Sequence, residues 1–402
     1  MKRIVSRELV IVMTVLVLGT LAMSVLQPIL PLYLTSIRVI PAILGLMFSV
    51  RMIGMAIGEG SWGWIADRVG LRLPMSTGAF VCAALVFCLV LTQKVPIIFL
   101  LFFFWGSVST AYLPMSRGYI GATTPPLTKA TFMAIFTTIM VASRSLGALM
   151  SGFIVDNWGY HRAFFISCGI ALLSGIVAIS GLKKIRLAKP KPPAVIPTPS
   201  DALPSPDQAY SYRSLALQGT VAAFYFLAMG ILMTFLPLLA TQVVGVDATA
   251  VGILFAIQGL VIIVLGIPLG MLGDRKGKRL MMILGLLLSA SGMTGVAFAE
   301  SFPWLIVFVV IHSLGMAMFS PAALSLLSNS VPLQRQNTAM GLYGVCEIIG
   351  AIIGSALGGF VWSGWGPQVT FLMGTVAATL GAVICFGLAG EKAGTRVQIP
   401  VS

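Results

Sequence analysis

Long apolar runs alternate with short polar segments along this chain. Twelve of the runs have about the 20 helical residues that are needed to cross the hydrocarbon core of a bilayer. We predict membrane spans at residues 9–34, 41–66, 73–92, 96–119, 130–155, 163–182, 216–240, 249–272, 279–299, 303–327, 338–361 and 367–389. The pattern predicts an all-α membrane protein whose even number of crossings places both chain ends on one side.

A polar segment separates the first six predicted spans from the last six. Residues 183–214 are rich in Pro, Lys and Ser and offer too little apolar surface to fold by burial. We therefore expect an N-terminal bundle over residues 1–182, a linker over 183–214 and a C-terminal bundle over 215–402.

The distribution of basic residues predicts the orientation. Nineteen Lys and Arg residues lie in the termini and the loops on the linker side, counting Arg279 at the edge of its span, and three lie in the opposite loops. Short loops rich in Lys and Arg face the cytoplasm. The sequence thus predicts a multi-pass protein of the cell (inner) membrane, with the linker and both termini in the cytoplasm.

Composition excludes several classes of function. Of the 402 residues, 58% are hydrophobic and 9% are charged, so the lipid bilayer is the expected environment. The formal charge of +14 is divided among short loops and forms no basic stripe, so no nucleic-acid partner is expected. Because the sequence has no glycine-rich phosphate-binding loop ending in Lys-Ser or Lys-Thr, ATP is not expected to drive the protein. We expect no cofactor and no metal, and we expect a monomer.

The two halves of the chain are related by an internal repeat. The offset is 207 residues, the separation of Asp67 and Asp274, and the same offset relates Pro114 to Pro321. Two homologous halves of six helices explain these matches. Transporters built from parallel repeats bind their cargo between the halves, near the middle of the bilayer.

A charged motif, Gly63 to Arg72, follows the second predicted span, and a second copy, Gly270 to Arg279, follows the eighth. It resembles the signature loop of the major facilitator superfamily, and it occurs at corresponding places in the two halves. The resemblance implies twelve helices in two six-helix bundles, transport by rocking of the bundles around a central site, and a latch between the halves at the cytoplasmic end. The latch residues would be Gly63, Asp67, Arg68, Gly70, Arg72, Gly270, Asp274, Arg275, Gly277 and Arg279.

A simpler interpretation is that the motif marks helix ends and follows the bias of positive charge. That interpretation accounts for Arg68 but not for two aspartates at matching positions, so we favour the latch. Its glycines have separate roles. Gly63 is expected to let another helix approach closely, and Gly70 is expected to permit a tight reversal of the chain.

A second resemblance lies in the fifth predicted span. The stretch from Arg144 to Gly152 is similar to the glycine-rich fifth helix of the superfamily's twelve-span drug/proton antiporters, with Ala148 and Ser151 in place of the usual Pro and Gly. The resemblance implies exchange of cargo for protons. Close helix packing on small residues is the alternative explanation of Gly147 and Gly152.

Several ionisable or amide side chains fall deep inside apolar spans. Charged groups at such depth are destabilising unless they face a cavity or one another, so each is a candidate substrate or proton site. The candidates are Arg51, Glu59, Arg144, Gln258, His312 and Glu347. The alternative is structural pairing, in which Glu59 or Glu347 neutralises Arg51 or Arg144.

We expect a secondary active transporter that exports a small organic molecule in exchange for protons. The alternative with the same fold is an importer or facilitator for a metabolite or an organic anion. An unpaired Arg144 would indicate an anionic cargo, whereas neutralisation by Glu347 would indicate a neutral or cationic one. A transporter-like receptor is the remaining option. An intramembrane enzyme is not expected, because neither a His-Glu-x-x-His zinc motif nor a Gly-x-Ser-x-Gly nucleophile occurs.

Overall fold

The computed structural model describes residues 7–124, 126–182, 212–331 and 335–388. Over these residues the chain is helical and has no strand. Most of the expected linker, residues 183–211, lies outside the described residues, as do the terminal segments 1–6 and 389–402. Twelve helical segments are long and apolar enough to cross a membrane, which confirms the predicted number of spans.

The first six spans contain eight helices, because the first and fourth spans are each interrupted. They are α1 (Arg7–Leu26), α2 (Leu30–Ser36), α3 (Pro41–Val69), α4 (Arg72–Leu91), α5 (Val95–Ser109), α6 (Tyr112–Thr123), α7 (Pro126–Trp158) and α8 (Tyr160–Gly181). The second six spans are α9 (Tyr212–Leu238) with the π-helical turn η2 (Leu239–Val243), α10 (Ala248–Lys276), α11 (Lys278–Ala297), α12 (Phe302–Asn329), α13 (Gln336–Trp365) and α14 (Pro367–Cys385).

The ends of the spans differ from the predicted ends by at most four residues. The difference matters at the charged motif, because Asp67 lies in the last turn of α3 and Asp274 lies near the end of α10. The motif therefore starts inside a helix instead of following it. Hydropathy marks where the apolar segment stops, whereas the helical hydrogen bonds continue to the glycine at which the chain reverses.

A proline lies at each of the two interruptions in the N-terminal half, although the equivalent Pro321 lies inside the continuous helix α12. The proline ring lacks an N–H and clashes with the carbonyl four residues earlier. In a continuous helix Pro114 would clash with the carbonyl of Thr110, and the chain breaks there, between α5 and α6. Pro28 lies in the break between α1 and α2, and Pro31 lies in the first turn of α2.

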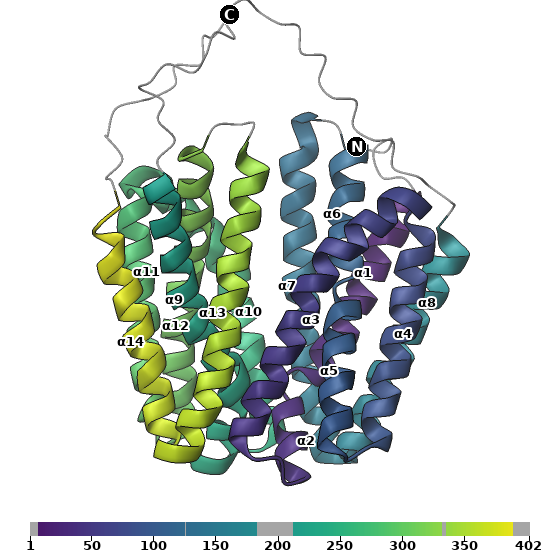
Figure 1. Ribbon diagram of the computed structural model, residues 1–402, viewed down its shortest axis with the longest axis horizontal. Helices are drawn as coiled ribbons and strands as arrows, with labels where there is room; N and C mark the ends of the chain where they lie inside the picture. Colours follow the sequence, from purple (N-terminus) through teal and green to yellow (C-terminus); the bar gives the residue numbers. More distant parts are fainter. Residues whose placement is uncertain (1–6, 125, 183–211, 332–334, 389–402) are drawn as a thin grey trace, which may run out of the picture.

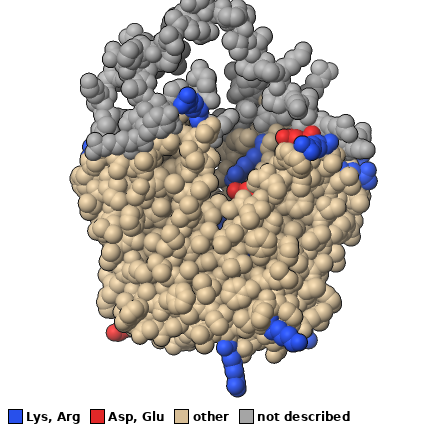
Figure 2. Space-filling model, in the orientation of Figure 1, with Lys and Arg blue, Asp and Glu red and all other residues tan. Residues whose placement is uncertain are grey.

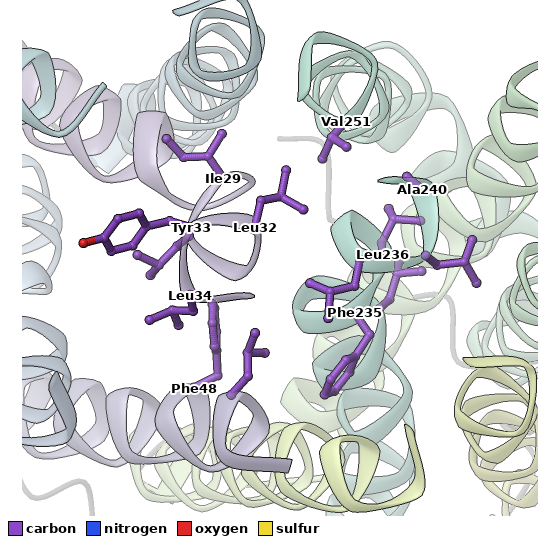
Figure 3. Close-up of a cluster of buried hydrophobic side chains, with 14 of the residues drawn as sticks. Ile29, Leu32, Tyr33, Leu34, Phe48, Phe235, Leu236, Ala240 and Val251 are labelled. Carbon is purple, nitrogen blue, oxygen red and sulfur yellow. The ribbon is translucent and has the colours of Figure 1, made fainter. Parts of the chain in front are cut away.

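The two bundles touch at one end and separate at the other (Figure 1). We call the end where α8 stops and α9 starts the linker end, and the opposite end the far end. At the far end one buried apolar cluster spans both bundles, and Leu32 and Phe48 of the first half lie near Phe235 and Leu236 of the second (Figure 3). Toward the linker end each bundle has its own cluster. The molecule is therefore closed at the far end and open at the linker end.

Tight turns between the helices recur at the repeat offset. Gly70 and Gly277 end α3 and α10 with positive φ angles of 84° and 99°, in agreement with the tight reversal expected of them. In the turns before α3 and α10, Arg38 and Gly245 occupy equivalent positions with φ angles of 66° and 78°. The N-terminal half therefore has a non-glycine residue in a left-handed conformation that glycine adopts more easily.

Candidate functional site

At the far end the halves meet along two helix pairs, α3 with α13 and α7 with α10. Glycines let the backbones come close. A Cβ added to Gly45 would lie 2.2 Å from the carbonyl oxygen of Ser355, and one added to Gly152 would lie 2.1 Å from that of Ala248. No side chain fits at such distances, so Gly152 of the antiporter-like stretch packs at the junction of the two halves.

Each of these helix pairs is also joined by a side chain that caps a helix of the other half. Asp156 near the end of α7 accepts hydrogen bonds at the start of α10, from the Ala248 N–H (3.1 Å), the Thr249 N–H (2.6 Å) and the Thr249 hydroxyl (2.5 Å). Ser363 near the end of α13 accepts a hydrogen bond from the Ala42 N–H at the start of α3 (3.1 Å). Both acceptors satisfy N–H groups that a helix leaves unbonded in its first turn. Asp156 and Ser363 are related by the repeat offset, so the closed end has two equivalent caps.

Replacement of Asp156 by Asn is expected to favour opening of the far end. The exposed carboxylate contributes a modest charge–dipole term, so we expect about a two- to fivefold increase in the far-end-open population. Spin labels at Leu91→Cys and Phe298→Cys, at the far ends of α4 and α11, would report it by pulsed electron resonance once the native cysteines are replaced.

Asn157→Ala is the control for this experiment, because the Asn157 side chain bonds only to the Phe153 carbonyl within α7 among the described contacts. An unchanged distance distribution in Asp156→Asn would show that the cap does not contribute to closure.

On the linker side of these contacts the same helices separate. Figure 2 shows a hollow between the halves, with basic and acidic side chains inside it. Glycines on the linker halves of α3, α10 and α13 have no atom within 4 Å of an added Cβ; they are Gly60, Gly63, Gly266, Gly341 and Gly344. The close approach expected at Gly63 is therefore not made in this conformation, and at Gly270 the nearest atom is Pro321 Cβ at 4.0 Å.

Arg51 lies on α3, ten residues after Pro41 and so about 15 Å from the far end of that helix. Its side chain is 8% exposed, and its guanidinium carbon lies 4.3 Å from the centroid of the Trp105 ring. Its Nε–H has no hydrogen-bond partner among the residues that the structure describes. The guanidinium interacts electrostatically with the Tyr112 hydroxyl and with Arg144.

Arg144 lies on α7, 14 residues before Trp158. Its side chain is exposed, and the next residue, Ser145, packs against Gly259 of the other half. Over the described residues, neither Arg144 nor Arg51 has a carboxylate within the 4.0 Å ion-pair distance. The structural pairing with Glu59 or Glu347 that the sequence left open is absent from this conformation.

Glu59 and Glu347 belong to opposite halves, and their carboxyl groups interact electrostatically across the hollow. Each lies 18 residues from the far end of its helix, Glu59 on α3 and Glu347 on α13. Glu59 is exposed and Glu347 is half-buried. In its own half Glu347 also interacts with Tyr225 and Tyr343. The structure thus brings the two acidic candidates together and, separately, the two basic ones.

The remaining candidates lie in the C-terminal half. Gln258 on α10 is buried, and within the described part of the chain its Nε2 has no hydrogen-bond partner. Its neighbour Gly259 packs against Ser145 of α7, so Gln258 lies where the two halves last touch below the hollow. His312 on α12 is buried with Nδ1 3.0 Å from the Ser289 hydroxyl of α11. His312 is therefore held between two helices of its own bundle.

The last basic residue of each motif copy bonds within its own half. Arg72 Nε donates to the Ile179 carbonyl at the end of α8 (2.8 Å), and Arg279 Nε donates to the Cys385 carbonyl at the end of α14 (3.0 Å). These carbonyls are left unbonded by the helix and carry its partial negative charge. Both arginines therefore cap helices inside their own bundles.

The motif aspartates make no hydrogen bond or ion pair in the described part of the chain. Asp274 and Gly270 line a cavity of about 180 Å³ together with Lys278 and Pro321. In the first copy, Arg68 stacks over Trp64, with 3.7 Å between its guanidinium carbon and the ring centroid. Because the linker end is open, a latch between the halves is not formed here, and it stays a proposal.

Inspection of the sequence overlooked three polar groups of the site, Tyr112, Tyr225 and Asp156. The tyrosines lie among aromatic and aliphatic residues, and no sequence pattern separates them from ordinary packing positions. Asp156 did have a signal. Its repeat partner Ser363 is another small residue with a capping oxygen, placed just before the same turn.

Three kinds of comparison with known proteins match this chain to the same class of membrane protein. The profile of the Major Facilitator Superfamily matches residues 12–216 and 218–398. The multidrug resistance protein MdtG of Klebsiella pneumoniae (strain 342) is 23% identical over 364 residues, which is 88% of this chain and 86% of that protein. The crystal structure of the nucleoside transporter NupG superposes with a TM-score of 0.77 at 13% identity, over 94% of this chain and 99% of NupG. The structure of the human organic anion transporter MFSD10 superposes with a TM-score of 0.62 at 17% identity, over 94% and 99%.

Proposed function

This chain belongs to the Major Facilitator Superfamily, and on that premise we propose that it couples proton movement to the transport of a small organic molecule. The family and the matching structures are transporters and not enzymes, and the chain is a multi-pass membrane protein. Proton coupling is the part of this proposal that goes beyond the family assignment. The observation that carries it is that Glu59 and Glu347, which belong to opposite halves and lie 18 residues from the far ends of α3 and α13, are close enough to interact electrostatically.

Electrostatics explains why such a pair suits coupling. Two ionised carboxylates repel, and the repulsion grows as water leaves the space between them. Closing the linker end removes that water, so closure favours a protonated pair. Conformation and proton occupancy are then linked, as coupled transport requires. The other titratable groups around Glu347 are Tyr225, Tyr343 and Cys346.

Export in exchange for protons is the first candidate for the direction, and the similarity to the multidrug resistance protein MdtG supports it. Co-transport of an organic anion with protons is the second, and the two unpaired arginines favour it. An anion and an ionised carboxylate repel each other, so an anionic cargo and a proton bind cooperatively. In proteoliposomes with an imposed pH gradient, exchange predicts accumulation of cargo on the acidic side, and co-transport predicts accumulation on the alkaline side.

The coupling is tested without knowledge of the cargo through the conformational equilibrium. Spin labels at Leu73→Cys and Leu280→Cys, at the linker ends of α4 and α11, report the opening of that end. Acidification from about pH 8 to about pH 5 adds protons to the carboxyl groups, and it is expected to raise the short-distance population about tenfold. Glu347→Gln, which removes one charge of the pair, should populate the closed state at both pH values.

Glu300→Gln is the matched control, since Glu300 lies in the far-end loop between α11 and α12 and should leave the pH response unchanged. If wild-type distances do not respond to pH, or Glu347→Gln responds as the wild type does, the carboxyl pair does not couple protons. The assignment to the transporter family would be unaffected.

A further inference from the structure

We propose that Arg51, Arg144 and Tyr112 form a binding site for an anionic group of the cargo, a carboxylate or a phosphate, on the N-terminal wall of the hollow. The inference rests on the proposed transport of a small molecule through this hollow, and it is independent of the direction of transport and of proton coupling.

The first observation is that Arg51 is buried and incompletely bonded. Its side chain is 8% exposed, and its Nε–H is an unpartnered donor. A buried donor without an acceptor is destabilising, so buried polar groups in folded proteins generally have a partner, and the described residues provide none for this one. Stacking on Trp105 at 4.3 Å fixes the plane of the guanidinium. A planar, oriented fork of donors suits a carboxylate or phosphate in particular.

The second observation is a concentration of positive charge without a counter-charge. Arg144 and Arg51 interact with each other, and the Tyr112 hydroxyl on α6 interacts with both. The carboxyl groups of the hollow are elsewhere. Glu59 lies eight residues beyond Arg51 on the same helix, about 12 Å closer to the linker end. Buried arginines in membranes normally have an anionic partner, and here the chain supplies none within ion-pair distance over its described residues.

The third observation comes from the repeat, because the C-terminal half lacks this cluster. The equivalent positions of the C-terminal half carry Gln258, Phe319 and Ala351 in place of Arg51, Tyr112 and Arg144. That half builds the same six spans around neutral side chains. The arginines are therefore an addition of the N-terminal half. Their placement makes the hollow asymmetric, with an anion site on one wall and neutral groups at the equivalent places on the other.

The position of the cluster suits cargo that enters from the linker end. On α7 the contacts with the other half include Gly252 against Ala148 and Gly259 against Ser145, the residue next to Arg144. On α3 the Ser49 hydroxyl donates a hydrogen bond of 2.8 Å to the Ile352 carbonyl of the other half, and Ser49 lies two residues before Arg51. Both arginines thus lie at the floor of the hollow, where the open part ends.

The test is direct binding to the purified full-length protein in detergent, measured by calorimetry with four small probes. Benzoate and phenyl phosphate carry the anionic group, benzamide is neutral, and benzylamine is a cation. We expect the two anions to bind at least about tenfold more tightly than the others. Arg144→Gln should weaken anion binding about ten- to hundredfold, and Arg144→Lys should weaken it less, because it keeps the charge and loses the fork.

Two further variants complete the design. Arg51→Gln should reproduce the loss if it folds, and because Arg144 is solvent-exposed, Arg144→Gln tests the site even if Arg51→Gln does not fold. Arg162→Gln, on the exposed far end of α8, is the matched control and should bind anions normally. Equal binding of benzamide and benzoate, or unchanged benzoate affinity in folded Arg144→Gln, would overturn the proposal. Anion binding without any response to a pH gradient would leave this site standing and would remove proton coupling alone.

Discussion

Replacing Gly152 by Leu is expected to abolish transport by preventing closure of the far end. A Cβ at this position would lie 2.1 Å from the Ala248 carbonyl oxygen and 2.5 Å from the Thr249 Cα. These are backbone atoms in the first turn of α10, which cannot move aside as the tip of a flexible side chain can. Overpacking of this kind costs about 1–3 kcal/mol or more, so the far-end-closed population should fall by on the order of a hundredfold.

The measurement combines the two pairs of spin labels defined above. In Gly152→Leu the Leu91–Phe298 distance should lengthen and the Leu73–Leu280 distance should shorten, since one end closes as the other opens. Gly169→Leu is the matched control, because no atom lies within 4 Å of a Cβ added to Gly169 on α8. A normal far-end distance in folded Gly152→Leu would mean that closure does not require the contact between α7 and α10.

The fold was largely predictable because a lipid bilayer allows the backbone few structures. An apolar run of sufficient length forms a helix, since no other element satisfies its backbone in lipid without pairing with another chain segment. The errors lie at helix ends outside the apolar segments, where this restriction no longer applies. The helices α3 and α10 continue past their apolar segments to Gly70 and Gly277, and the hydrogen bonding of the backbone, not hydropathy, decides where they end.

The ionisable residues of the candidate site could be predicted from the sequence, but which of them pair with one another could not. Depth in an apolar span identified Arg51, Arg144, Glu59 and Glu347 as unusual, and one sequence permits several ways to pair them. Pairing depends on the rotation and the separation of helices, which only the packed structure fixes. It also depends on conformation, because side chains that lie apart in an open hollow approach one another when it closes. Tyr112 was missed because nothing in its local sequence distinguishes an aromatic residue at a site from one in a core.

The positions of the glycines on α3 and α13 indicate how these helices pack when the linker end is closed, a state that this structure does not show. At the closed far end, a Cβ added to Gly45 would lie 3.1 Å from the Cα of Gly359 on the other half. The two helices run antiparallel. Eighteen residues toward the linker end along each of them lie Gly63 and Gly341. Eighteen residues are five helical turns, so these glycines are on the same faces as the touching pair, about 27 Å away along the axis.

The double variant Gly63→Cys/Gly341→Cys is therefore expected to form a disulfide only when the linker end closes. Neither glycine has an atom within 4 Å of an added Cβ in the open structure, whereas closure that mirrors the far end would bring the Cα atoms within the roughly 4.4–6.8 Å of a disulfide. With a protease site placed in residues 183–211, oxidation should hold the cleaved halves together on a denaturing gel. Transport should stop, and a reductant should restore it.

Gly169→Cys/Gly341→Cys, with one thiol on the opposite side of the bundle, should give no cross-link. If Asp67 forms a latch in the closed state, adding Asp67→Asn should lower the cross-linking yield. A cross-link absent under all conditions, with both thiols reactive, would show that α3 and α13 do not meet at the linker end.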